Sequence, residues 1–154
     1  MLDLPPMQQE RIVCSITAAI KYQVPANILL AIAEKEGGKP WMVVANENGT
    51  YDIGPMQFNS AYLHDLRKHG ISPAHVVGVG CYPYDLAAWR LRQHLLRDTG
   101  NVWARAANYH SRSDKYNFRY QQDIVRGARK WALWLESKFS IYELESTTAV
   151  PLSH

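Results

Sequence analysis

Apolar residues recur every three or four positions along the first quarter of the chain, which predicts two successive helices. The first helix begins at Pro5–Pro6 and ends before Val24–Pro25, because proline fits the first helical turn and breaks a later one. Its apolar stripe consists of Ile12, Ile16, Ala19 and Ile20. The second helix spans residues 26–36, and Gly37–Gly38 followed by Pro40 prevents its continuation.

Turn residues and further helical patterns alternate along the rest of the chain. Residues 46–52 are rich in turn formers, and Asn48–Gly49 favours a type I′ turn between two short antiparallel strands. Apolar periodicity and glycine stops predict further helices over 60–69, 84–98, 101–109 and 117–138. The pattern therefore predicts an α+β fold that is mostly α-helical and carries a small β-hairpin.

Length and composition fit one globular domain. With 154 residues, of which 47% are hydrophobic and 20% charged, the chain can bury a single core. We expect this domain over residues 1–140 and a C-terminal extension over 141–154. No apolar run reaches the roughly 20 residues that a membrane span needs. The first residues lack the pattern of a signal peptide, so we expect that segment to be absent here or removed.

The net charge of +3 is unevenly distributed. Residues 86–138 hold eleven Lys and Arg against four Asp and Glu, whereas the rest of the chain is net acidic. These cations either cover solvated helix faces or form a surface for an anionic polymer. They form no recognisable DNA-reading helix, so we do not expect nucleic acid as a partner.

The chain has two cysteines, Cys14 and Cys81, and no Cys-x-x-Cys pair. Their spacing is compatible with a disulfide across the core and equally with two buried free thiols. The histidines at positions 64, 69 and 75 do not make a convincing metal set, so the sequence predicts neither a metal site nor a cofactor.

Glu36 is the first candidate for chemistry. It ends an apolar helix just before Gly37–Gly38, where its carboxyl can point into a partly desolvated cleft. Desolvation raises the pKa of a carboxyl and suits it to act as a general acid. The alternative is a helix-end carboxylate that faces water. Glu34, two residues earlier, projects from a different helix face and serves as the comparison.

Two segments carry a family resemblance. Ile-Leu-Leu-Ala-Ile-Ala-Glu-Lys-Glu-Gly-Gly at residues 28–38 precedes Asn-Gly-Thr-Tyr-Asp-Ile-Gly-Pro-Met-Gln-Phe-Asn at residues 48–59. An apolar helix that ends in Glu, followed by a Gly-x-Met-Gln turn, resembles the catalytic region of soluble lytic transglycosylases. With the later Tyr-His-Ser at 109–111, the chain is most similar to the branch that accompanies type IV secretion, conjugation and pilus machines. The resemblance covers residues 9–134.

The resemblance implies a lysozyme-like single domain with Glu36 as its catalytic acid and base. The substrate-binding residues implied by matching motifs are Gly54, Met56, Gln57, Asn59 and Tyr109. His110 and Tyr120 are further candidates for the cleft, with core packing as the alternative for both. Trp41, in the loop after Gly37–Gly38, is the candidate for stacking on a sugar. The chain departs from the family pattern at Gly37, Pro55 and His110-Ser111-Arg112, which replace Ser, Leu and Asn-x-Gly.

The implied reaction is cleavage of the β-1,4 bond between N-acetylmuramic acid and N-acetylglucosamine in peptidoglycan, with a 1,6-anhydromuramyl product. Asp52 leaves two alternatives open, because it is either a turn residue or a second carboxylate that stabilises a cation. In the second case the protein resembles a lysozyme-type muramidase that uses Glu36 and Asp52 for hydrolysis. A non-catalytic peptidoglycan-binding adaptor is the remaining alternative.

The same resemblance implies where the protein works and with what. Peptidoglycan as the substrate implies the periplasm and local opening of the cell wall for a secretion or conjugation machine. The implied partners are glycan strands and secretion-system components, and we expect a monomer. In an oxidising compartment, the disulfide between Cys14 and Cys81 is favoured over free thiols.

Overall fold

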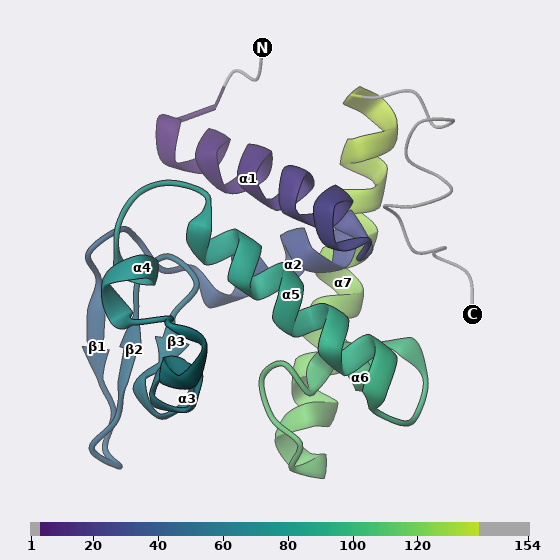
Figure 1. Cartoon of the computed structure of the whole chain (residues 1–154). Coiled ribbons are helices and arrows are strands. Elements are labelled where there is room, and N and C mark those ends of the chain that lie inside the picture. The colour runs from purple at the N-terminus through teal and green to yellow at the C-terminus, as the bar shows by residue number, and fades with distance from the viewer. Residues whose placement is uncertain (1–3, 139–154) are drawn as a thin grey trace.

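Prolines and glycines set the limits of the first two helices, as predicted. A computed structural model describes residues 4–138 (Figure 1). Helix α1 (Pro6–Tyr22) begins at a proline and ends at Gln23, whose N–H donates to the carbonyls of Ala19 and Ile20. Helix α2 (Ala26–Glu36) ends at Gly37, which has a φ of 60°. A left-handed residue after the last turn is the usual way to satisfy free helix carbonyls.

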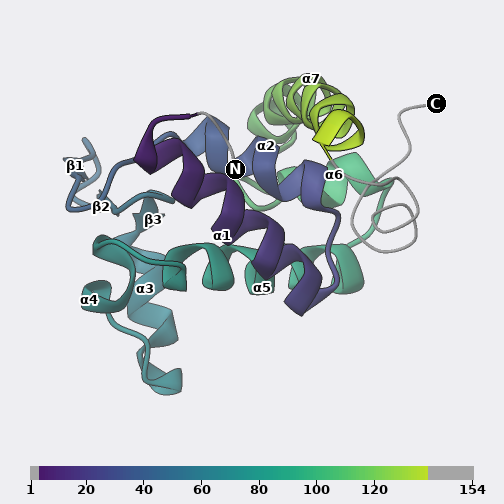
Figure 2. The ribbon, with the colours of Figure 1, turned by 90° about the horizontal axis from the view of Figure 1, so that it is seen from above.

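Helix α2 is the centre of the core. Its first eight residues, from Ala26 to Ala33, are all buried. It contacts α1, α5 (Tyr82–Arg97) and the long helix α7 (Asp114–Lys138), and Figure 2 shows it between α1 and α7. A Cβ at Gly127 of α7 would lie 2.9 Å from the Cβ of Ala31, so the absence of a side chain permits the close approach of α7 to α2.

A three-stranded antiparallel sheet follows α2. Its strands are β1 (Val43–Ala45), β2 (Tyr51–Ile53) and β3 (Phe58–Asn59), in that order across the sheet. Val43 lies opposite Ile53, and Phe58 lies opposite the same residue on the other side. The predicted small β element is confirmed, with one strand more than the hairpin that the sequence suggested.

The turn between β1 and β2 differs from the predicted type I′ turn. That turn requires a positive φ at both Asn48 and Gly49. Of these two residues only Gly49 has one, at 85°. Instead, the Gly49 N–H donates to the Asn46 carbonyl at 3.1 Å, and the Asn46 N–H donates to the Thr50 carbonyl at 2.8 Å. The loop is therefore longer than two residues. Asn46 and Asn48 belong to this loop, beyond the last paired residues of β1 and β2.

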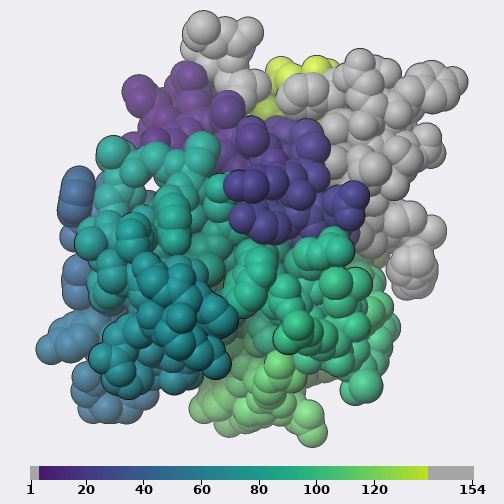
Figure 3. Space-filling view, in the orientation of Figure 1, coloured from purple at the N-terminus to yellow at the C-terminus, as the bar shows by residue number. Residues whose placement is uncertain are grey.

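The remaining helices follow the sequence pattern with small shifts at their ends. Helix α7 begins three residues earlier than predicted and α5 two residues earlier. The predicted helix over 60–69 consists of two elements, α3 (Ser60–Asp65) and the 3-10 helix η1 (Leu66–His69), and α6 spans Val102–Ala107. Helix α4 (Pro73–Val77) was not among the predicted helices. Figure 2 shows the α3–η1 segment projecting from the body of the protein, and in Figure 3 the same segment lies on the near face. This projection forms one wall of a surface groove described below.

The architecture is thus α+β and mostly helical, as the sequence predicts. Among the described helices, none combines the length and the hydropathy of a membrane-spanning segment. The predicted extension at 141–154 lies outside the residues that the structure describes.

Cys14 of α1 and Cys81, immediately before α5, are joined by a disulfide in the structure. Their Cα atoms are 5.0 Å apart, and 67 positions separate them in the sequence. The closed loop contains α2, the whole sheet, α3 and α4. A second contact lies beside the disulfide, because the Gly80 N–H donates to the Glu10 carboxylate at 2.9 Å.

Opening this loop is expected to destabilise the fold. In the chain-entropy model, a cross-link across a loop of this length contributes roughly 4 kcal/mol to the free energy of unfolding. We expect the double variant Cys14→Ser/Cys81→Ser to lose about that amount in urea unfolding. Wild-type protein treated with reductant and alkylated, with the mass checked, should match the variant. Equal unfolding midpoints for the oxidised and reduced proteins would contradict the prediction.

Candidate active site

The Glu36 side chain lines a cavity of about 310 Å³, which lies between the end of α2, the sheet, α5 and the segment after α6. We call it the Glu36 cavity. Of the residues predicted from the sequence, seven line it: Glu36, Asp52, Met56, Gln57, Asn59, Tyr109 and His110. The structure therefore brings together side chains from 36 to 110 that the chain keeps far apart.

The Glu36 carboxyl is a weak acid. Removal from water raises its pKa to about 7, from an ordinary value of 4.5. The Tyr120 hydroxyl, which donates to Glu36 Oε1 at 3.3 Å, and the Arg90 cation lower the pKa, whereas the Asp52 charge raises it further. Desolvation is the largest of these effects, so the carboxyl holds its proton in a sizeable fraction of molecules at neutral pH.

The neighbouring carboxyl of Glu34 lies in a different environment. Glu34 is exposed and its Oε1 accepts from Lys130 at 2.5 Å. This ion pair stands on the α7 side of α2, whereas Glu36 faces the cavity. The two carboxyls lie in different environments because an α-helix turns by about 100° per residue, so side chains two positions apart point to different sides.

Asp52 on β2 shares the cavity with Glu36 and is held by Asn59. The Asn59 amide nitrogen donates to Asp52 Oδ1 at 3.2 Å and to the Thr50 hydroxyl at 2.9 Å. Its amide oxygen accepts from the Ala61 N–H at 2.9 Å and so caps α3. One asparagine therefore fixes the Asp52 carboxyl, the hairpin loop and the start of α3 relative to one another.

The Gly54–Gln57 turn forms the wall next to Glu36. The Gln57 backbone N–H and its side-chain amide nitrogen both donate to the Gly54 carbonyl, at 3.0 and 2.9 Å. Gln57 has a φ of 53°, an uncommon conformation for a residue with a side chain. Met56 is 1% exposed and fills the space behind the turn. Gly54 does not line the cavity; it shapes the turn instead.

Gly38 fixes this turn against the end of α2. Its N–H donates to the Pro55 carbonyl at 3.1 Å, and a Cβ at Gly38 would lie only 2.2 Å from the Gly54 carbonyl oxygen. No other residue fits such a close backbone approach. The position of Gln57 relative to Glu36 therefore depends on a glycine at 38.

Two aromatic side chains from the segment after α6, Tyr109 and His110, form another part of the cavity wall. Tyr109 is 3% exposed, and its pKa is raised by burial. The His110 and Tyr120 rings stack with centroids 4.6 Å apart. Desolvation, together with the Lys35 and Arg90 cations, lowers the pKa of His110. Tyr120 lies behind the cavity rather than on its surface and contacts the site through its hydrogen bond to Glu36.

Four residues of this cavity were not predicted from the sequence, and Arg90 is the most important of them. Its guanidinium lies 4.1 Å from the ring centre of Tyr62 and 4.4 Å from that of Tyr109. An arginine within a helix predicted to be buried was the available signal, because such a cation needs partners. The other missed residues are Asn46, Asn48 and Thr50 of the hairpin loop.

Trp41, the candidate for stacking on a sugar, lies outside the Glu36 cavity. Its side chain is 69% exposed. The indole ring lies next to Gly78, where a Cβ would be only 3.0 Å from the ring. Within residues 4–138, no group of three or more His, Cys, Asp or Glu side chains is placed to hold a metal ion.

Fold and cavity together define a mostly helical α+β protein in which one weakly acidic carboxyl shares a cavity with a second carboxyl, a guanidinium and several amide and hydroxyl groups. This arrangement can donate a proton to a bound substrate near neutral pH.

Comparison with known proteins gives the family. Protein IpgF of Shigella sonnei is 31% identical over 118 residues, which cover 73% of this chain and 77% of IpgF. Invasion protein IagB of Salmonella typhimurium is 28% identical over 123 residues, which cover 76% of both chains. A scan against models of protein families found no match. The chain belongs to the same family as IpgF.

The buried carboxyl should leave a signature in stability. Because the pKa of Glu36 is higher in the folded protein than in the unfolded chain, the folded state binds more protons between pH 4.5 and about 7. Stability contributed by the protonated form is therefore lost as pH rises through this window. We expect Glu36→Gln, which cannot ionise, to gain roughly 2–3 kcal/mol relative to wild type at pH 8 and almost nothing at pH 4.

Urea unfolding at the two pH values measures this difference. Glu34→Gln is the matched control, since it removes an exposed carboxyl from the same helix, and it should keep the wild-type pH dependence. A Glu36→Gln protein whose stability parallels wild type from pH 4 to pH 8 would show that the carboxyl is not desolvated.

Proposed function

We propose that this protein is a peptidoglycan lytic transglycosylase that cleaves the β-1,4 bond between N-acetylmuramic acid and N-acetylglucosamine. The observation that carries the proposal is the Glu36 carboxyl, whose pKa of about 7 suits a general acid, in a cavity that it shares with Asp52, Arg90 and several amide and hydroxyl side chains. Amide and hydroxyl side chains are the groups that hydrogen-bond sugar hydroxyls and acetamido groups. The resemblance of residues 28–59 to transglycosylases supports the same reaction.

The first step uses the protonated form of Glu36. Its proton passes to the glycosidic oxygen as the bond to the muramic anomeric carbon breaks, which leaves an oxocarbenium-like centre. Asp52 lines the same cavity, and its negative charge can stabilise this positive charge. The Tyr120 hydroxyl donates to Glu36 Oε1 at 3.3 Å, which holds the carboxyl in place and stabilises the carboxylate that forms.

The second step returns the proton. The Glu36 carboxylate accepts the proton of the muramic C6 hydroxyl, whose oxygen attacks the anomeric carbon and closes the 1,6-anhydro ring. One bond to the anomeric carbon is broken and one is formed, and Glu36 ends as it began. Water is not consumed, so a single carboxyl serves as acid and then as base.

Asp52 favours a second candidate, lysozyme-type hydrolysis. It lies in the cavity with Glu36, and its Oδ1 accepts a hydrogen bond from the Asn59 amide nitrogen at 3.2 Å. A second carboxylate can activate water or stabilise the cation long enough for water to attack. The product then carries a reducing end instead of an anhydro ring. The two reactions use the same residues and differ only in the attacking oxygen.

We further propose that the protein acts in the periplasm and opens the cell wall locally for a secretion machine. The relative IagB is named an invasion protein. The disulfide between Cys14 and Cys81 supports an oxidising compartment. In this setting the partners are glycan strands and secretion-system components.

Loss of the acid should abolish cleavage. We expect Glu36→Gln to lower the rate of muropeptide release from sacculi at least about 1000-fold, because the proton donor is gone while the shape of the cavity is kept. Glu34→Gln should release the same products at the wild-type rate. Unchanged release by Glu36→Gln would rule out Glu36 as the proton donor, and a wild type that binds sacculi without releasing products would leave the adaptor alternative.

Product analysis of the Asp52→Asn variant separates the two reactions. For a transglycosylase we expect 1,6-anhydro ends from both proteins, with a fall of about 10- to 100-fold in the variant's rate from lost electrostatic support. Mass spectrometry distinguishes the products, because a hydrolysed end is heavier by one water. Reducing ends from wild type that disappear in Asp52→Asn would assign the protein as a muramidase instead.

A further inference from the structure

A second groove continues from the Glu36 cavity and shares Arg90 and His110 with it. We call it the arginine groove; its volume is about 580 Å³. The projecting α3–η1 segment forms one wall, through Tyr62 and Leu66. Helix α5 and the segment after α6 form the rest. A polymer that extends beyond the Glu36 cavity in this direction must lie in this groove.

The two compartments differ in charge. The Glu36 cavity contains two carboxyls, one guanidinium and several neutral amides. The arginine groove is lined by Arg90, Arg97 and Arg112 and by no Asp or Glu. Arg97 is exposed and has no ion-pair partner among residues 4–138. Three cations facing one groove repel one another, and an anionic ligand relieves that repulsion.

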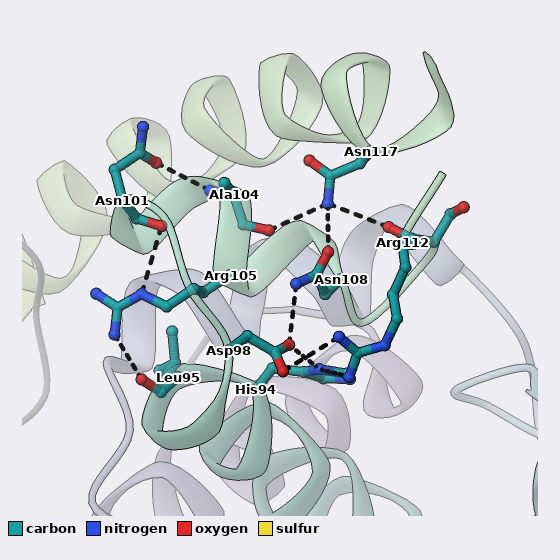
Figure 4. A network of polar contacts seen from close by, with 10 residues as sticks. His94, Leu95, Asp98, Asn101, Ala104, Arg105, Asn108, Arg112 and Asn117 are labelled. Carbon is teal, nitrogen blue, oxygen red and sulfur yellow. Dashed lines mark hydrogen bonds and ion pairs between the residues drawn. The ribbon is translucent and has the colours of Figure 1, made fainter. Parts of the chain in front are cut away.

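One buried carboxylate beneath the groove orients its polar residues (Figure 4). Asp98 is 9% exposed, and its Oδ1 lies 3.1 Å from Arg112 Nη1. Its Oδ2 lies 2.6 Å from His94 Nδ1 and accepts from the Asn108 amide at 2.9 Å. This carboxylate contacts Arg112 and His94 and leaves Arg97 without an ion-pair partner in the described part of the chain, so the groove keeps an excess of positive charge.

The loop that carries Arg112 is also held from α7. The Asn117 amide nitrogen donates to Asn108 Oδ1 at 2.7 Å and to the Ser111 carbonyl at 3.1 Å (Figure 4). Because both ends of this network are fixed to helices, the Arg112 guanidinium is positioned before any ligand binds. Such preorganisation lowers the entropic cost of binding.

We propose that the arginine groove binds a carboxylate attached to the lactyl ether of a muramic residue, next to the bond that Glu36 cleaves. This inference rests on the proposed function. A strand of β-1,4-linked N-acetylated amino sugars is itself neutral, and carboxylates enter it only through the lactyl group or the peptide built on that group. Guanidinium groups pair with carboxylates through strong, directional hydrogen bonds. Arg97 and Arg112 therefore act as specificity residues that distinguish peptidoglycan from an uncharged strand of chitin type.

Binding of three probes tests the proposal. The probes are N-acetylglucosamine hexamer, which has no carboxylate, amidase-treated strands with free lactyl carboxylates, and strands that keep their peptides. Dissociation constants are measured in the Glu36→Gln background so that strands are not consumed. Arg97→Gln is the first variant, because Arg97 is exposed and its loss leaves the Asp98 network intact. Arg97→Gln/Arg112→Gln is the second, and Arg129→Gln, an exposed arginine of α7 outside the groove, is the control.

We expect Arg97→Gln to raise the Kd for at least one carboxylate-bearing strand about tenfold and the double variant to raise it further. The Kd for the neutral hexamer should stay within about twofold, and Arg129→Gln should match its parent throughout. A loss confined to peptide-bearing strands assigns the peptide carboxylates, and a loss on denuded strands assigns the lactyl carboxylate.

Two outcomes overturn the inference in distinguishable ways. Equal Kd values for parent and Arg97→Gln on both carboxylate strands, or an equal loss on the neutral hexamer, refute the arginine groove alone, provided that wild type cleaves sacculi. If wild type neither binds nor cleaves any of these strands, the proposed function and this inference fail together.

Discussion

The desolvation of one carboxyl is the interaction on which the rest of the site depends. Glu36 ends the most buried helix of the protein, and the Gly54–Gln57 turn packs against that helix end through Gly38. Water is excluded from the carboxyl by this packing and by the buried Tyr120 side chain behind it. Hydrogen bonding and the nearby cation only moderate an effect that burial produces. The site is thus a consequence of how the core is packed.

Much of the fold follows from the sequence, because prolines, glycines and apolar periodicity act locally. The limits of α1 and α2 were predictable for this reason. The hairpin turn was not, since Asn48–Gly49 is compatible with several loop lengths and hydrogen bonds of Asn46 decide between them. Glu36 was predictable as a candidate from its place at a helix end. Arg90 was missed, because its role depends on rings that come from α3 and from the segment after α6.

Charged side chains are distributed unevenly between the Glu36 cavity and the arginine groove. Neutral amides and two carboxyls surround the reactive position, and guanidinium groups follow along the adjoining groove. The excess of Lys and Arg in the second half of the sequence is therefore partly concentrated at one place by α5 and the loop after α6. The sequence count alone left open whether these cations served solvation or binding. The position of Arg97 and Arg112 in one groove supports the binding role that we propose for these two residues.

The close contact between Gly127 and Ala31 has a consequence for the acidity of the site. Tyr120 stands on α7 seven residues before Gly127, about two helical turns away on the same face. The spacing of the two helices at Gly127 therefore sets how near the Tyr120 hydroxyl comes to Glu36. A bulkier residue at position 127 would push α7 away from α2 and weaken the hydrogen bond between Tyr120 and Glu36, two turns away. A substitution at position 127 can therefore change the pKa of Glu36 while every residue that lines the cavity stays the same.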